Sequence, residues 1–78
     1  MKLTFDPKYN VAYIRFHEKM EDVQTLHISD ELMVDMSPSG KIYGIELLNA
    51  KDQLISEDMG KLLVVNEESG VKNEMSFN

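Results

Sequence analysis

The sequence contains no cysteine, and this absence removes several kinds of site from consideration. Without a thiol, the chain cannot form a disulfide, a thiolate nucleophile, a zinc–thiolate centre or an iron–sulfur centre. A chain of 78 residues hides only roughly 60 to 65% of the surface of its unfolded state, so we expect one domain over residues 1–78 with a modest core. A metal or self-association remains as a source of additional stability.

Basic residues are scarce compared with acidic ones. Eight lysines and arginines face fourteen aspartates and glutamates, which gives a net charge of −6. Nucleic-acid affinity depends on lysines and arginines that neutralise phosphates, so we expect no nucleic-acid partner. The acidic surplus would suit a basic protein partner, but it also serves simply to keep a small domain soluble, and we favour the second explanation.

Long hydrophobic runs are also missing. No window is long enough to cross a membrane, and the segment Met1–Pro7 reaches an acid and a proline before the apolar core of a signal peptide could form. We therefore expect no membrane association and a cytoplasmic location.

Glycine is too sparse for a phosphate-binding loop. The four glycines are scattered through the sequence, and no nucleophile elbow or paired-histidine zinc motif occurs. The usual sequence signals for a nucleotide-binding protein or a hydrolase are therefore absent.

The sequence instead contains a series of short alternating segments that are typical of half-buried strands. They cover residues 3–5, 11–16, 23–28, 32–36 and 41–48. These segments predict an α+β, mainly β, fold: an antiparallel meander of about five strands, a short helical segment and a C-terminal hairpin.

The segment Ser37–Gly40 predicts a type I turn, since serine, proline and glycine stand at their preferred positions. A four-residue connection would place Met36 opposite Lys41 and Val34 opposite Tyr43, with Tyr43 on the apolar face. Within the following strand, Gly44 predicts a bulge or the close approach of an aromatic ring such as that of Tyr13.

The region after Leu48 loses the alternation. Asn49 and Ser56 are both candidate helix caps, which predicts one or two short helical turns. Residues 57–77 are compatible with a helix begun at Ser56 or with a hairpin. We favour the hairpin, because Gly60 would lie inside the helix and residues 62–65 are rich in β-forming side chains.

Four groups of residues between positions 5 and 54 follow a recognisable order. They are Phe5-Asp6-Pro7 with Tyr13-Ile14, Ser29-Asp30-Glu31 with Val34-Asp35, Ser39-Gly40-Lys41-Ile42, and Gly44-Ile45-Glu46-Leu47-Leu48-Asn49-Ala50. In this order the sequence resembles the bacterial family known as domain of unknown function 2283 (DUF2283). The resemblance implies only a compact β-rich unit of prokaryotic or phage origin, and it supplies no activity, cofactor or catalytic residue to carry over. Asn10 departs from it, because an acid is expected there.

Strand parity places four ionisable residues on the face opposite the apolar one. They are Arg15, His27, Asp35 and Glu46. Their chemistry would suffice for anion binding or for an acid–base site. A solvated sheet face with opposite charges on neighbouring strands explains the same pattern, and we favour it. We therefore assign no catalytic and no cofactor-binding residue and expect no cofactor.

Two histidines raise the question of a metal site. His17 and His27 occur with acidic residues at Glu18, Glu21, Asp22 and Asp35. They lack the fixed spacing of metal ligands, so we predict no metal site.

The same outer face is predicted to carry apolar side chains at Val11, Tyr13, Met33 and Ile42. Exposed apolar surface favours association, so the interpretation that we prefer is a small non-enzymatic interaction module that forms a homodimer. Cover by the helical segment or the hairpin of the same chain is the alternative. An acidic regulator of a basic partner and, less favoured, a ligand-binding or acid–base site are the other functions that remain open.

Overall fold

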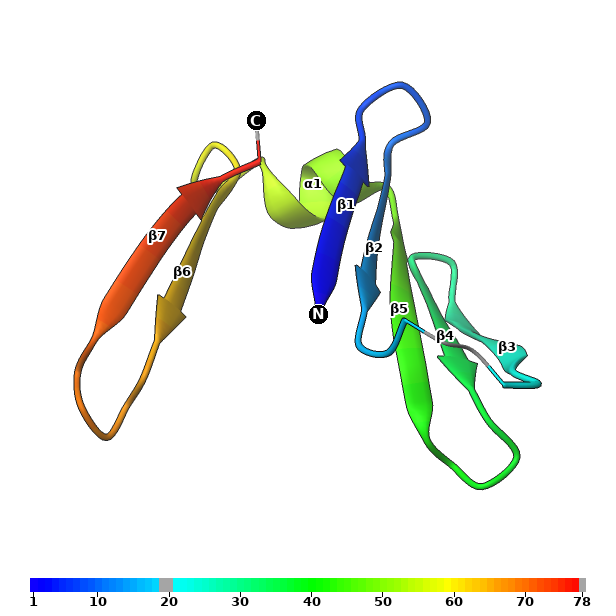
Figure 1. Cartoon of the computed structure of the whole chain (residues 1–78). Coiled ribbons are helices and arrows are strands. Elements are labelled where there is room, and N and C mark those ends of the chain that lie inside the picture. The colour runs from blue at the N-terminus through cyan, green and yellow to red at the C-terminus, as the bar shows by residue number, and fades with distance from the viewer. Residues whose placement is uncertain (19–20, 78) are drawn as a thin grey trace.

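Seven strands and one short helix form the fold in the computed structural model, which describes residues 1–18 and 21–77 (Figure 1). The strands of the larger sheet are β1 (Lys2–Asp6), β2 (Val11–Arg15), β3 (Gln24–Ser29), β4 (Leu32–Met36) and β5 (Ile42–Leu48). The helix α1 (Ala50–Leu54) follows, and β6 (Lys61–Val65) and β7 (Lys72–Ser76) form a separate hairpin. The mainly β fold class with a short helix and a C-terminal hairpin is confirmed.

The five-stranded sheet is antiparallel, with the strand order β1-β2-β5-β4-β3. A simple meander would place β2 beside β3. Here β2 pairs with β5, so the chain passes from β2 to the far edge of the sheet and returns through β4 and β5. β1 and β3 therefore form the two edges of this sheet.

The first hairpin is closed by a turn that the sequence favours. Asp6 accepts hydrogen bonds through its Oδ1 atom from the backbone N–H groups of Lys8 and Tyr9, at 2.9 and 3.3 Å. Asn10 adopts a left-handed conformation with φ of 59°, which asparagine tolerates better than most residues. The Asp6 side chain and the left-handed backbone of Asn10 together shape the turn around Pro7.

The hairpin between β4 and β5 contains the predicted turn but a different register. The N–H of Gly40 donates to the carbonyl of Ser37 at 2.9 Å, as expected for the turn. However, Met36 lies opposite Ile42, and Val34 lies opposite Ile45, with a register shift between Asp35 and Met36. The predicted pairs Met36–Lys41 and Val34–Tyr43 were therefore wrong.

The physical reason is a β-bulge, which inserts one extra residue into a strand and changes the alternation beyond it. Ile45 still faces Val34 and Leu47 faces Leu32, so the predicted common face of these apolar residues is confirmed. Alternation predicts Ile42 on the outer face, but in the structure Ile42 lies opposite Met36, beyond the bulge. Alternation alone therefore cannot assign the face of Ile42.

Helix α1 begins after Asn49, one of the two predicted caps, but without the capping bond that was expected from its side chain. Asn49 occupies the N-cap position with φ of 52°, but its side chain makes no capping hydrogen bond. Asn10 supplies the acceptor instead, because the N–H of Lys51 donates to its Oδ1 atom at 2.7 Å. Ser56 follows the helix and donates its hydroxyl to the carbonyl of Asp52 at 2.6 Å, so it does not begin a helix.

The C-terminal hairpin is confirmed in place of the helical alternative. β6 pairs with β7 from Lys61–Ser76 to Val65–Lys72, and Asn66 accepts hydrogen bonds from the N–H groups of the turn. Figure 1 shows this hairpin splayed away from the larger sheet, with α1 between the two.

The core is small for a chain of this length. Only three apolar residues of the described chain are buried, namely Ala12, Tyr43 and Ala50, and no large side chain is completely enclosed. The Cα radius of gyration is 14.0 Å, whereas a compact chain of this length would have about 11.5 Å. The hairpin and the sheet therefore pack along only part of their length.

Within the described residues, the one helix is far too short to cross a membrane.

Candidate functional site

The two faces of the five-stranded sheet differ in chemistry, because directly paired residues point to the same side. One continuous row runs Leu26, Val34, Ile45, Ile14 and Leu3 across all five strands. We call this side the apolar face. The opposite side, the polar face, carries Thr25, Asp35, Gly44, Arg15 and Lys2 in one row and His27, Met33, Glu46, Tyr13 and Thr4 in the next.

The four ionisable residues predicted from the sequence all lie on the polar face, but they occupy two different rows. Arg15 and Asp35 are separated by the strand that carries Gly44, and His27 and Glu46 are separated by the strand that carries Met33. Residues two strands apart lie about 10 Å from each other. Direct contact within either pair would therefore require long side chains to bend toward one another.

Tyr13 occupies the centre of this face. Its hydroxyl donates to Asp35 Oδ2 at 2.7 Å, and the hydroxyl of Thr25 donates to Asp35 Oδ1 at 2.6 Å. The phenol reaches Asp35 by lying over Gly44, where an added Cβ atom would overlap with the phenol oxygen. The close approach of Tyr13 predicted for Gly44 is confirmed, and the bulge lies directly beside it.

The surroundings of Tyr13 favour its neutral form. Burial, the hydrogen bond to Asp35 and the negative charges of Asp35 and Glu46 raise the pKa of Tyr13 to about 12, while the positive charge of Arg15 opposes the change. The phenol is therefore a hydrogen-bond donor at neutral pH. Arg15, Asp35 and Glu46, which are three of the four ionisable residues predicted from the sequence, thus act on the pKa of Tyr13. Tyr13 itself was not among the predicted four.

Arg15 and His27 have different environments. The Arg15 guanidinium carbon lies 5.9 Å from the centroid of the Tyr13 ring, and its Nε atom is buried with no hydrogen-bond partner among the described residues. His27 Nε2 lies 4.0 Å from Asp30 Oδ1, and both side chains are exposed. Asp35 accepts hydrogen bonds from two hydroxyls, those of Tyr13 and Thr25.

Two signals in the sequence could have identified this arrangement. Tyr13 alternates onto the same face as Arg15, and a glycine inside a strand leaves room for a neighbouring ring. Thr25 could be assigned to the same face by parity alone. The bond between Tyr13 and Asp35 depends on the pairing of β2 with β5, which alternation within single strands does not reveal.

Possible metal ligands do not gather in the described part of the chain. Among residues 1–18 and 21–77, no group of three histidine, aspartate or glutamate side chains is arranged to hold a metal ion. His17 packs its ring edge to face against Tyr43, with centroids 5.3 Å apart.

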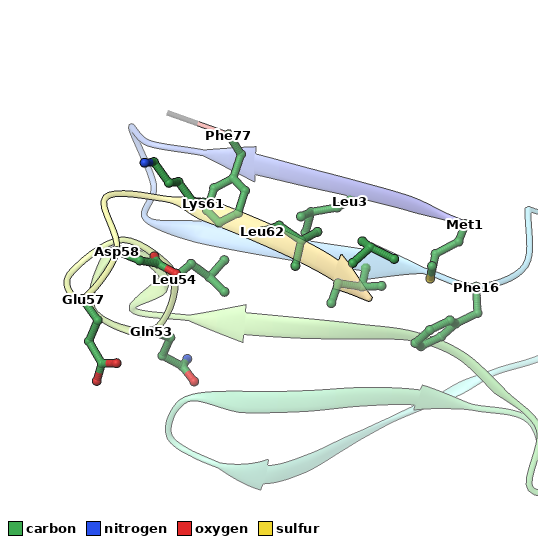
Figure 2. A pocket seen from close by; sticks show the side chains of 12 residues that line it. Met1, Leu3, Phe16, Gln53, Leu54, Glu57, Asp58, Lys61, Leu62 and Phe77 are labelled. Atoms are coloured by element: carbon green, nitrogen blue, oxygen red, sulfur yellow. The ribbon is translucent and has the colours of Figure 1, made fainter. Parts of the chain in front are cut away.

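An apolar groove forms the second candidate site, on the other side of the sheet. It has a volume of ≈ 510 Å³ and lies between the apolar face and the hairpin (Figure 2). Leu3, Ile14 and Phe16 line it from the sheet, and Leu62 and Val64 line it from β6. None of the four ionisable residues predicted from the sequence lines this groove.

One end of the groove is closed by aromatic contact and bordered by charge. Phe77 packs against Phe5 with ring centroids 6.1 Å apart, which ties the end of the hairpin to β1. Lys61 and Asp58 lie beside this end in Figure 2, and the Lys61 ammonium is 3.7 Å from Glu74 in an exposed ion pair. The groove is therefore a largely apolar slot with polar groups at one end.

Comparison with known families gives one match. A family described as "Protein of unknown function (DUF2283)" matches residues 2–51, which confirms the resemblance noted in the sequence. The matched segment contains all five strands of the larger sheet and ends before the hairpin. Searches of curated proteins and of solved structures gave no significant match.

Proposed function

The chain belongs to the DUF2283 family of proteins of unknown function, and we propose that it is a small non-enzymatic interaction module that self-associates. The observation that carries this proposal is an excess of exposed surface. The accessible surface is 6051 Å², whereas a folded monomer of 9.0 kDa exposes about 4,900 Å² by the usual area scaling.

The excess has the size of a protein interface. The difference is about 1,200 Å², and a stable protein–protein interface buries about 800 Å² on each partner. A second copy could therefore cover the additional surface and bring the exposed area of each chain close to the value for a compact domain. Burial of this surface in a dimer would also add stability. The single chain has a small core and cannot form a disulfide.

The hairpin contains much of this exposed apolar surface. Leu63 and Val64 are 54% and 51% exposed, and Val71 and Met75 are exposed to a similar degree. Clusters of exposed apolar side chains mark interaction sites in soluble proteins. The proposed association therefore involves the hairpin, rather than the outer face that was predicted from Val11, Tyr13, Met33 and Ile42.

The polar face gives less support for an enzyme. Asp35 is engaged by Tyr13 and Thr25, and His27 lies in the other row beside Asp30. A general base needs a free acceptor within hydrogen-bond reach of a bound substrate. The groove, where a substrate would be enclosed, is on the opposite side of the sheet.

Molecular mass in solution tests the proposal. We expect light scattering coupled to size-exclusion chromatography to give twice the chain mass at high concentration and a falling mass on dilution. A strict monomer at the highest accessible concentration would refute self-association.

Regulation of a basic partner remains a prediction, because the net charge of −6 is its only physical support. A pull-down from the native host at low and at high salt tests it. Retention of a basic protein at low salt and its loss at high salt would support this function, and retention of no basic protein at low salt would contradict it.

A further inference from the structure

The exposed strand edges of the molecule differ in how well they are protected. An edge strand has unpaired backbone groups, and natural proteins protect it with charged side chains, prolines or bulges. The edge strand β1 contains Lys2 and Asp6, β3 has a register shift after His27, and β7 contains Lys72 and Glu74. In contrast, β6 has four consecutive apolar residues at positions 62–65, with a single charge at its first residue.

The hydrogen bonds at the two ends of the hairpin identify the free groups of β6. Phe77 donates its N–H to the carbonyl of Gly60 at 3.1 Å, and Asn66 donates to the carbonyl of Val71 at 2.9 Å. Because antiparallel pairs alternate between bonded and non-bonded positions, the groups of residues 62 and 64 point toward β7. The N–H and C=O groups of Lys61, Leu63 and Val65 then point away from it, toward the free edge.

We infer that β6 pairs edge to edge, in antiparallel orientation, with β6 of a second copy, so that two hairpins form one four-stranded sheet. This inference rests on the proposed self-association and identifies the partner and the contact. The register follows from the free groups. A two-fold axis at Leu63 places Leu63 opposite Leu63 of the second copy and Lys61 opposite Val65 of the second copy, with two N–H···O=C bonds in each facing pair.

This register is self-complementary in both chemistry and charge. Leu62 lies opposite Val64 and Leu63 opposite Leu63 of the second copy, so three of the five facing pairs are apolar, and no two lysines face each other directly. An isolated two-stranded hairpin is marginally stable in water, whereas four strands with apolar faces are sufficient for stable pairing. A second copy is the partner to which we commit, because every chain carries the same apolar edge.

A charge-pair experiment tests the inference at Leu63. Leu63→Lys and Leu63→Glu each place like charges directly opposite one another across the two-fold axis, and like charges in this position destabilise the pairing. We expect each variant alone to dimerise at least about 100-fold more weakly than the wild type. We expect an equimolar mixture of the two variants to form a heterodimer, because lysine then faces glutamate.

A matched control separates this contact from a general effect of charge. Ile42→Lys changes an apolar residue that is 44% exposed and lies outside the hairpin, so we expect it to dimerise as the wild type does. A wild-type dimer that Leu63→Lys leaves intact would overturn the edge pairing while the proposed self-association would stand. A monomeric wild type would overturn both. Two folded variants that remain monomeric when mixed would overturn the register.

Hydrogen exchange on the unmodified protein provides a test that does not depend on the folding of a variant. The amides of Lys61, Leu63 and Val65 should exchange more slowly as the protein concentration rises, because pairing covers their N–H groups. The amides of β3 should not change. Equal exchange at Leu63 in dilute and concentrated samples of a dimeric protein would overturn the inference.

Discussion

The larger sheet and the C-terminal hairpin differ in how their apolar side chains are distributed over the two faces. In the sheet, apolar and polar residues alternate, so that one side carries the row from Leu26 to Leu3 and the other carries the Tyr13–Asp35 contact. In the hairpin, residues 62–65 place apolar side chains on both faces of β6, and all of them are exposed.

This difference indicates whether the apolar surface of each region is covered within a single chain. A continuous apolar run is typical of a strand buried on both faces, whereas alternation is typical of a sheet that faces water on one side. The sheet therefore has the sequence pattern that its surroundings require, and β6 has the pattern of a strand in a larger assembly. The family match covers the sheet and ends at residue 51, before the hairpin.

The largest expected effect is on the sheet, at Gly44. A Cβ atom at this position would overlap with the Tyr13 phenol, so Gly44→Val must displace the ring and break its hydrogen bond to Asp35. We expect the free energy of unfolding to fall by about 3 kcal/mol. Urea denaturation followed by circular dichroism, at one fixed protein concentration, measures the change.

A double-mutant cycle identifies the cause of that loss. If the phenol is the obstacle, Gly44→Val should cost less than about 1 kcal/mol in a Tyr13→Ala background, since the two sites are in contact. Equal costs in both backgrounds would show that the ring is not what excludes a side chain at Gly44.

The next effect concerns the join between the sheet and the hairpin, at Phe77. The ring of Phe77 packs edge to face against Phe5. Phe77→Ala should lower the free energy of unfolding by about 1.5 kcal/mol. Met75→Ala is the matched control in the same hairpin, where a side chain that is 58% exposed should cost less than about 0.5 kcal/mol. Equal losses in urea denaturation would contradict packing of the hairpin against β1 through Phe77.

A smaller effect is expected at Asn10, which joins the first turn to the start of α1. Its Oδ1 atom accepts from the N–H of Lys51, and its amide donates to Asn49 at 3.2 Å. Asn10→Ala should cost about 1 kcal/mol, as for the loss of a helix cap. Asn10→Asp retains the acceptor and places a negative charge at the helix N-terminus, so we expect a change within about 0.5 kcal/mol.

These two variants also test how the sequence departs from the family pattern. The resemblance predicts an acid at the position of Asn10. Urea denaturation of both proteins shows whether an acid can perform the same structural role. A loss for Asn10→Asp as large as that for Asn10→Ala would indicate that the donor to Asn49 matters more than the acceptor for Lys51.

The sequence was sufficient for those features that depend on neighbouring residues. The strands, the turn at Ser37–Gly40 and the hairpin follow from alternation and turn preferences. It was insufficient where distant segments meet. The placement of β2 beside β5 brings Tyr13 to Asp35, and Asn10 reaches Lys51 across 41 positions of the chain. A bulge was one of the two predictions for Gly44, but the register that it imposes between β4 and β5 depends on the paired strand.

The smallest expected effect is a pH dependence on the polar face of the sheet. Burial, the bond to Asp35 and nearby negative charge raise the pKa of Tyr13 from 10.0 to about 12. The folded protein therefore holds the phenolic proton more tightly than the unfolded chain does. The resulting stabilisation is fully present below pH 10, and it is lost as the pH rises from 10 toward 12.

Tyr13→Phe removes this titration and is the matched control. The difference in ultraviolet absorbance between the two proteins reports ionisation of Tyr13, and urea denaturation at several alkaline pH values reports stability. We expect the wild type to lose its advantage over Tyr13→Phe as the pH rises above 10. Asp35→Asn should lower the pKa of Tyr13, because it removes the negative charge while burial remains. An unchanged midpoint in Asp35→Asn would assign the raised pKa to burial alone and would contradict the role of Asp35 at the centre of the polar face.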